Sequence, residues 1–160
     1  MTLRKSNIIS KIGSLIPGFN GYSDRADRRN SERIFRDQNS KLLERSEYSV
    51  IEHQKKLIAA GDIEESKKWE IVRKAINTCI PKFKHAPYGE SSFFSKEQIK
   101  EDELEEISKL DEEIVVRIQI IFKTTENDLN ETLSAQIILN NLKEIDGVLL
   151  NRSNFISRYK

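Results

Sequence analysis

Apolar residues recur at three- and four-residue intervals along most of the chain, which is the spacing of one face of an amphipathic helix. The pattern predicts helices over residues 3–16, 24–60, 62–80, 95–126 and 128–158. Gly and Pro, with 6 and 3 residues, are too scarce for the frequent turns of an all-β fold. We therefore predict an all-α fold.

The predicted helix over residues 24–60 has few apolar residues for its length. It begins at Ser23 or Asp24, either of which can cap a helix, and no Gly or Pro interrupts it. Its apolar residues form a narrow stripe of pairs seven or eight residues apart, namely Ile34 and Phe35, Leu42 and Leu43, Val50 and Ile51, and Leu57 and Ile58. Such a stripe is typical of a coiled-coil seam, and we expect this helix to extend beyond the rest of the bundle.

Gly, Pro and short polar residues mark several helix boundaries. Gly61 is suited to the left-handed conformation that ends many helices, and Asp62 can cap the next one. Pro81 is expected to end or kink the third helix. Ser95, followed three residues later by Gln98, has the pattern of a capping box at the start of the fourth.

Four helices joined by short connections predict a four-helix bundle or two helical hairpins, preceded by a short N-terminal amphipathic helix. We assign residues 1–22 to an amphipathic N-terminal arm and turn, and residues 23–160 to a helical bundle domain. A chain of 160 residues has the size of one domain and can bury a substantial core.

The N-terminal arm has apolar residues on one face and basic or hydroxyl residues on the other. This distribution suits a helix that lies on an anionic membrane surface or docks on a partner protein. The residues assigned to this contact are Leu3, Lys5, Ile8, Ile9, Lys11, Ile12, Leu15 and Ile16. The alternative is an arm that docks against its own bundle.

The start of the long helix is rich in arginine. The residues assigned to an anion or partner contact are Arg25, Arg28, Arg29, Arg33 and Arg36. Such a stretch can bind phosphates of lipid headgroups or of RNA. The alternative is a solvated helix face with internal ion pairs, since Asp24 and Glu32 stand four residues before Arg28 and Arg36.

Residues 81–95 form the longest stretch without helical periodicity, and they contain three aromatic residues close together. Tyr88, Phe93 and Phe94 cannot all be exposed to water without cost. They either close one end of the bundle core or form a partner-binding loop.

The sequence carries none of the common catalytic or metal-binding motifs. It has no glycine-rich phosphate loop, no G-x-S-x-G turn and no cluster of Cys and His. Neither His53 nor His85 follows a Glu by three residues, so the Glu-x-x-His pattern of di-iron bundles is absent. Cys79 lies on an apolar face and is expected to be a small core residue. We predict no catalytic residues, no cofactor and no metal.

The formal net charge of +1 conceals an uneven distribution. Residues 1–22 contain bases and no acid, whereas residues 101–126 are strongly acidic. A duplex-binding protein usually has a dominant basic surface, so nucleic acid is the less favoured partner. The single cysteine and the lack of a continuous apolar run of about 20 residues predict a cytoplasmic protein, peripheral to a membrane if the arm binds lipid.

Short motifs give the chain a resemblance to a known group of proteins. The motifs are Leu15-Ile16-Pro17-Gly18-Phe19-Asn20-Gly21-Tyr22, a following Arg-Arg helix, and Tyr88-Gly89 before Phe93-Phe94 and Leu104. They resemble an uncharacterised family of small helical bacterial and archaeal proteins with an I-P-G-[FY]-x-G-Y N-terminal element. The resemblance implies no activity, and it suggests that the turn at 16–22 meets the loop at 88–94.

These features lead to two main hypotheses of function. The first is a non-enzymatic helical interaction or scaffold protein with an unidentified protein partner. It would act at an anionic membrane surface through its arm, or as a homo-oligomer through the seam of the long helix. The second is a nucleic-acid-binding module that uses the Arg-rich start of the long helix. An enzyme with a site assembled from scattered carboxylates is a third class.

Overall fold

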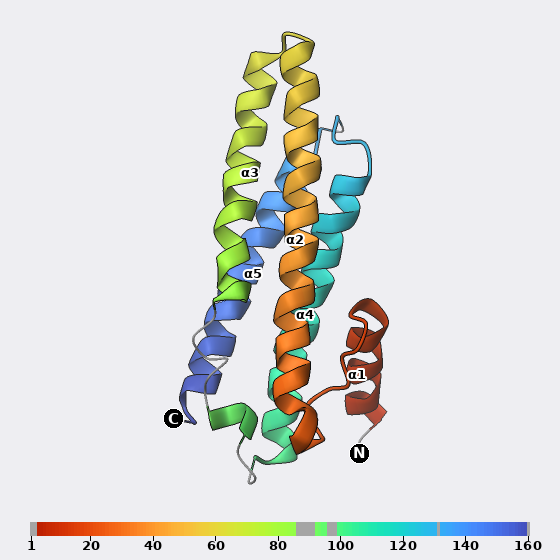
Figure 1. The fold of residues 1–160 in the computed structure, drawn as a ribbon, viewed down its shortest axis with the longest axis vertical. Coiled ribbons are helices and arrows are strands. Elements are labelled where there is room, and N and C mark those ends of the chain that lie inside the picture. Colours follow the sequence, from red (N-terminus) through yellow and green to blue (C-terminus); the bar gives the residue numbers. More distant parts are fainter. Residues whose placement is uncertain (1–2, 86–91, 96–98, 131, 160) are drawn as a thin grey trace.

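The structure, a computed structural model, describes residues 3–85, 92–95, 99–130 and 132–159, and these residues confirm the all-α prediction. The helices are α1 (Leu3–Leu15), α2 (Arg28–Ala59), α3 (Ile63–Lys84), α4 (Glu101–Glu126) and α5 (Ser134–Ser157). Short 3-10 helices η1 (Arg25–Asp27) and η3 (Ser92–Ser95) lie before α2 and α4. Figure 1 shows these elements, and no strand occurs in the described ranges.

The helices form two hairpins that pack together. α2 pairs with α3, and α4 pairs with α5. α2 also packs on α4 and α3 on α5, so the hairpins close into a four-helix bundle, while α1 lies outside it against α4 (Figure 1). The α2–α3 hairpin extends past the end of α4 and the start of α5, which confirms the extension expected of the long helix (Figure 1).

One residue of each of the first three pairs in the apolar stripe of α2 lies inside the bundle, whereas Ile58 is exposed. Phe35, Leu43 and Val50 are fully buried, because α2 stands between α3 and α4 and both neighbours cover its stripe. Helices of the same chain cover these three residues, and packing of a second copy along the seam stays a prediction. The other helices add broader faces, such as Ile107, Ile114, Ile118 and Ile121 of α4.

The connection between α2 and α3 follows the prediction. Gly61 has φ 79°, its N–H donates to the Ile58 carbonyl at 3.0 Å, and the Asp62 N–H donates to Leu57 at 2.9 Å. This pair of bonds is the Schellman motif, which needs a residue in the left-handed region. The Asp62 carboxylate accepts the Glu65 N–H at 3.3 Å and so caps α3.

Two predicted boundaries in the first hairpin are wrong. Residues 25–27 form the 3-10 helix η1, in which Asp24 Oδ1 accepts the Ala26 N–H at 3.0 Å, and the α-helix begins only at Arg28. α3 does not end at residue 80, because it continues through Pro81 to Lys84. Phe83 in this last turn is fully buried with its ring 6.3 Å from that of Phe35, and this packing offsets the hydrogen bond that Pro81 cannot donate.

Two boundaries in the second hairpin also differ from the prediction. α4 begins at Glu101 rather than at residue 95, and its first turn is capped where the Lys100 N–H donates to the Glu103 carboxylate at 3.2 Å. Of the predicted capping box, Ser95 ends η3 and Gln98 is outside the described residues. α5 begins at Ser134 rather than at 128. Asp128 Oδ1 accepts the backbone N–H of Asn130 at 2.9 Å, a local turn that competes with helix.

The turn after α1 aims an aromatic residue into the bundle. Gly21 has φ 78°, and a Cβ at this position would lie 3.1 Å from Ile9 Cδ1. Only glycine combines this backbone conformation with so close an approach to α1. The next residue, Tyr22, is 1% exposed.

Replacing Ile12, which is fully buried on α1, tests the docking of this helix. Ile12→Ala is expected to lower the free energy of unfolding by about 2–5 kcal/mol, because it removes buried methyl groups and leaves a cavity. Ile71→Ala, at a 62% exposed position of α3, is the control and should change it by less than about 0.5 kcal/mol. Urea denaturation followed by circular dichroism measures both. Equal stability of the two variants would mean that α1 is not docked.

Candidate functional site

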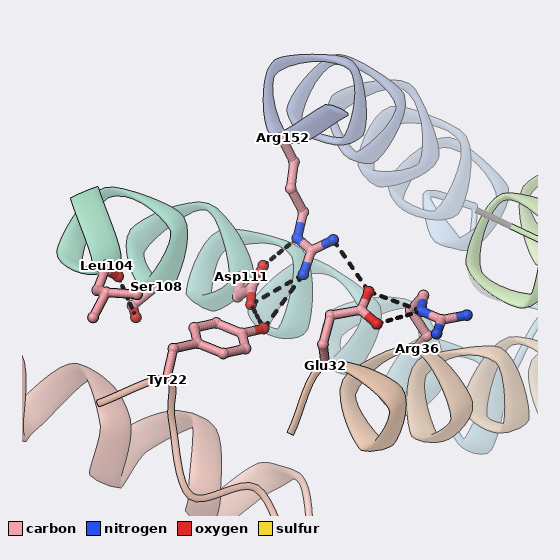
Figure 2. Close-up of polar contacts among 7 residues, drawn as sticks. All are labelled: Tyr22, Glu32, Arg36, Leu104, Ser108, Asp111 and Arg152. Carbon is pink, nitrogen blue, oxygen red and sulfur yellow. Dashed lines mark hydrogen bonds and ion pairs between the residues drawn. The ribbon is translucent and has the colours of Figure 1, made fainter. Parts of the chain in front are cut away.

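Four polar side chains meet inside the bundle and form what we call the buried cluster, drawn in Figure 2. Tyr22 comes from the turn after α1, Glu32 from α2, Asp111 from α4 and Arg152 from α5. None of the four is more than 2% exposed. Because charged groups are rarely buried without partners, their mutual contacts decide what the cluster does.

The guanidinium of Arg152 is the centre of the buried cluster. Its Nε donates to Asp111 Oδ1 at 2.5 Å, and its Nη2 donates to the Tyr22 hydroxyl at 3.3 Å. Its Nη1 lies 3.6 Å from Glu32 Oε1. The Tyr22 hydroxyl in turn donates to Asp111 Oδ2 (Figure 2). One side chain thus joins α5 to α4, to α2 and to the N-terminal turn.

Aromatic rings close the buried cluster on its remaining sides. The Cζ atom of Arg152 lies 4.8 Å from the ring centre of Phe35 and 5.8 Å from that of Phe94. Rings at these distances attract a guanidinium and keep water away from it. The cluster is therefore a sealed structural junction rather than an open binding site.

Burial also sets the protonation of the buried cluster. It raises the pKa of the Tyr22 phenol well above its ordinary 10.0, and the nearby Asp111 carboxylate adds to the shift. Tyr22 therefore keeps its proton at neutral pH and can donate it to Asp111. Burial also raises the pKa of Asp111, while the charge and hydrogen bond of Arg152 act in the opposite direction.

Glu32 connects the buried cluster to the surface of the protein. Both of its carboxylate oxygens accept the Nε–H of Arg36 at 2.8 Å. Arg36 is half-buried, and its two Nη groups point away from Glu32 (Figure 2). A series of charged contacts therefore runs from Arg152 in the core to a guanidinium at the surface.

Arg36 borders a pocket between the start of α2 and the end of α3, which we call the Arg36 pocket. Its volume is about 420 Å³, and its described lining includes Arg33, Arg36, Asp37, Ser40, Phe83 and Lys84. Asp37, the only acid of that described lining, pairs with Lys41 at 3.0 Å, and Lys84 pairs with Glu44. Because Arg36 is itself paired with Glu32, the excess positive charge of this lining comes mainly from Arg33.

One of the five arginines predicted to bind an anion serves the fold instead. Arg28 is 5% exposed, and its Nε donates to the Tyr22 carbonyl at 2.7 Å. This bond holds the turn that delivers Tyr22 to the buried cluster. The prediction of an anion contact at Arg28 is therefore wrong, because its side chain is turned inward.

Three of the other arginines, at positions 29, 33 and 36, follow one face of α2 at helical spacing. Arg29 and Arg33 are exposed on successive turns of α2, and Arg36 lies between Glu32 and the Arg36 pocket. The side chain of Arg25 is outside the described part of the chain. Arg33 and Arg36 are brought together at the Arg36 pocket.

The apolar face of the N-terminal arm packs on the bundle. Ile8, Ile12 and Ile16 are buried, and Ile9 and Leu15 are half-buried. The structure therefore bears out docking of the arm on its own bundle. In this arrangement α4 covers the apolar side chains that would enter a lipid surface, and membrane contact of the arm stays a prediction.

The basic face of the arm also contacts the bundle. Lys11 pairs with Glu112 of α4 at 2.8 Å, so the acidic helix attracts the basic arm. The side chains of Leu3 and Lys5 are outside the described residues. Across the described ranges, no helix is long and apolar enough to cross a membrane.

The aromatic loop residues close one end of the core rather than forming a partner-binding loop. Phe93 is fully buried and Phe94 is 1% exposed, while Tyr88 lies outside the described residues. The ring of Phe93 lies 5.0 Å from that of Tyr159 at the end of the chain. The prediction of a partner contact at Phe93 and Phe94 is therefore wrong, because both rings are used inside the protein.

Sequence reasoning missed the buried cluster, although a signal for it was present. Asp111 follows Ile107 by four residues and precedes Ile114 by three, so it stands within the apolar stripe of its helix. Arg152 stands in the same way between Leu149 and Ile156. A charge at a core position of a helix predicts an opposite charge at the facing position of another helix.

Cys79 is a core residue, as predicted. It is 3% exposed on α3. Burial raises the pKa of its thiol to about 12, and Asp146 adds to the shift. The thiol is therefore protonated at neutral pH and lacks the thiolate that nucleophilic chemistry needs.

No family model matches the sequence, and comparisons with curated proteins and with solved structures found no match. The family resemblance of the N-terminal motif therefore stays a prediction. The contact that it suggested between turn and loop is present for the described residues, since the rings of Tyr22 and Phe94 are 5.3 Å apart.

Asp111→Ala tests the buried cluster. It is expected to lower the free energy of unfolding by about 3–5 kcal/mol, because it removes the carboxylate nearest to a buried guanidinium. The double variant Asp111→Leu, Arg152→Met replaces both charges by apolar groups and should be more stable than Asp111→Ala alone. Urea denaturation compares the variants. If the loss in the double variant equals or exceeds that of Asp111→Ala, the two charges are not coupled as described.

Proposed function

We propose that this protein is a helical interaction module that recognises one anionic group of a binding partner in the Arg36 pocket. The observation that carries the proposal is the orientation of Arg36. Its Nε is held by the buried Glu32 carboxylate, and its side chain lines the pocket with both Nη groups directed away from Glu32 (Figure 2). A guanidinium presented in this way matches the planar, two-oxygen edge of a carboxylate or phosphate.

The ion pair with Glu32 lowers the conformational entropy that the Arg36 side chain loses when an anion binds. Glu32 is 2% exposed and is itself in contact with Arg152, so the ion pair that holds Arg36 is anchored in the rigid core. An arginine side chain in water loses conformational entropy when it binds a ligand. Much of that entropy is already lost in the free protein, which favours binding.

The remaining lining of the Arg36 pocket suits a small anionic group. Arg33 adds a second guanidinium from the preceding turn of α2, and the fully buried Phe83 of α3 forms part of the wall. The pocket volume of about 420 Å³ lies in the range of small-ligand sites, roughly 300–1,000 Å³. The acid Asp37 is neutralised by Lys41 and does not repel an anion strongly.

One anionic group is favoured over a nucleic-acid backbone. A duplex-binding surface contacts several phosphates along a basic stripe. Here Arg28 is turned into the core, and the exposed arginines of α2 are followed by Asp37. A localised site of two arginines fits an acidic or phosphorylated segment of a protein, in line with an interaction or scaffold role.

Titration of inorganic phosphate, followed by NMR of the arginine side chains, tests the proposal at low ionic strength. The Nε–H resonance of Arg36 should shift and saturate, because its guanidinium would bind the anion. Arg33→Gln and Arg36→Gln should each weaken binding by about tenfold, as expected when a charge-assisted hydrogen bond is lost. Arg73→Gln is the matched control, since Arg73 is also held by a carboxylate, Glu70, but does not line the Arg36 pocket.

The outcomes separate the hypotheses. Binding of a phosphoserine peptide that is lost in Arg33→Gln, with Arg73→Gln unaffected, supports the proposal. Arg33 is exposed, so this variant is expected to fold even if Arg36→Gln does not. If none of the probes binds, or if both variants bind as well as the control, the proposal is wrong. Binding to duplex DNA with a steep salt dependence would replace it by the nucleic-acid hypothesis.

A further inference from the structure

The unequal lengths of the two hairpins leave a step in the bundle. α4 ends at Glu126, while α2 and α3 continue beyond it (Figure 1). A second pocket of about 390 Å³, here called the step pocket, lies between α2 and the residues that follow α4. It borders α2 about four turns after the Arg36 pocket, so the two sites are separate.

The step pocket is acidic. Its described lining contains the acids Glu52, Glu126 and Asp128 against one base, Lys56. Glu52 pairs with Lys55 at 2.9 Å, which leaves Glu126 and Asp128 as the main source of negative charge. The C-terminal end of α4 adds its carbonyl groups, which carry partial negative charge. Both the side chains and the helix end therefore favour a cation.

A buried histidine in the wall of the step pocket points independently to a ligand. His53 lines the pocket and is 8% exposed, and its Nε2 is buried with no hydrogen-bond partner among the described residues, as is Nε1 of the adjacent Trp69. A buried polar atom without a partner costs about 1–3 kcal/mol, so such an atom calls for an explanation. A ligand that donates an N–H to this nitrogen would remove the cost.

The protonation of His53 decides the type of ligand. Burial lowers the pKa of His53 below its ordinary 6.5 and Lys56 lowers it further, whereas Asp128 and Glu65 act in the opposite direction. At neutral pH the ring is therefore uncharged and has one nitrogen that can accept a hydrogen bond. An acceptor beside two carboxylates is suited to a group that carries both positive charge and N–H donors.

We propose that the step pocket binds an organic cation with N–H donors, such as a primary ammonium or a guanidinium, with His53 as acceptor and Glu126 and Asp128 as counter-charges. A metal ion is not favoured, because no group of three or more His, Cys, Asp or Glu side chains in the described ranges is arranged to hold one. This site is independent of the Arg36 pocket, and its ligand has the opposite charge.

Trp69 is an intrinsic fluorescent probe for this site. Trp69 is the only tryptophan of the chain, and its ring lies 5.0 Å from that of His53 at an interplanar angle of 81°. A change in the hydrogen bonding or charge of His53 should alter the emission of Trp69. The protein therefore needs no added label.

Titration with n-butylammonium chloride at pH 7.5, against sodium chloride at equal ionic strength, tests the proposal. We expect a saturable change in Trp69 emission with the ammonium salt and none with sodium. Glu126→Gln should weaken binding by about threefold, as for an exposed charge, and His53→Gln by about tenfold. Glu64→Gln, which removes an exposed acid in the first turn of α3, is the matched control and should bind like the parent.

Two further measurements identify the source of the cation and detect binding that leaves Trp69 emission unchanged. Spermidine and a lysine-containing peptide distinguish a free polyamine from a protein side chain. NMR of the imidazole nitrogens gives a second readout, since the chain has only two histidines. If neither emission nor the His53 nitrogens respond, or if Glu126→Gln and His53→Gln both bind like Glu64→Gln, the proposal is wrong. Arg36→Gln should leave this binding unchanged, so the two proposed sites can fail separately.

Discussion

A guanidinium sealed in a protein interior must find acceptors there, because leaving water would otherwise cost several kcal/mol. Arg152 meets this requirement with Asp111 of α4, Glu32 of α2 and the Tyr22 hydroxyl from the N-terminal turn. Each acceptor lies on a different segment, so the contacts of this one side chain require α2, α4 and the N-terminal turn to meet at the same place. The left-handed Gly21 and the bond from Arg28 to the Tyr22 carbonyl belong to the same constraint, because they aim Tyr22 inward.

The long helix α2 shows how a helix with few apolar residues can lie in the middle of a bundle. Between its buried apolar residues it places small hydroxyl side chains against its neighbours, and these bond to their own helix. Ser40 donates to the Asp37 carbonyl at 2.8 Å and Ser46 to the Leu42 carbonyl at 2.9 Å. Such residues bring neighbouring helices close without leaving a hydroxyl unpaired. The small polar residues of α2 are thus part of the packing. Other polar residues of the same helix line both pockets.

Both proposed sites follow from this architecture and differ in charge. The Arg36 pocket lies where the charged contacts of the core reach the surface, so its cation is held by a rigid neighbour. The step pocket exists because α4 is shorter than α2, which leaves a helix end beside a buried His53. The two pockets therefore border the same helix, α2, about four turns apart.

The sequence by itself determined the fold class and the approximate helices, because the spacing of apolar residues along a helix is a local property. Gly61 and Asp62 were identified for the same reason, since a cap is formed by residues next to it in the chain. The helix start predicted at residue 128 was wrong because a local turn at Asp128 competes there with helix, and α4 begins at Glu101 rather than at residue 95. Only the tertiary structure decided that the apolar face of α1 packs on α4, since a protein surface and a lipid surface satisfy the same sequence pattern. It also decided that Tyr22, Asp111 and Arg152 meet, because partners up to 130 residues apart in the chain are chosen by packing in three dimensions.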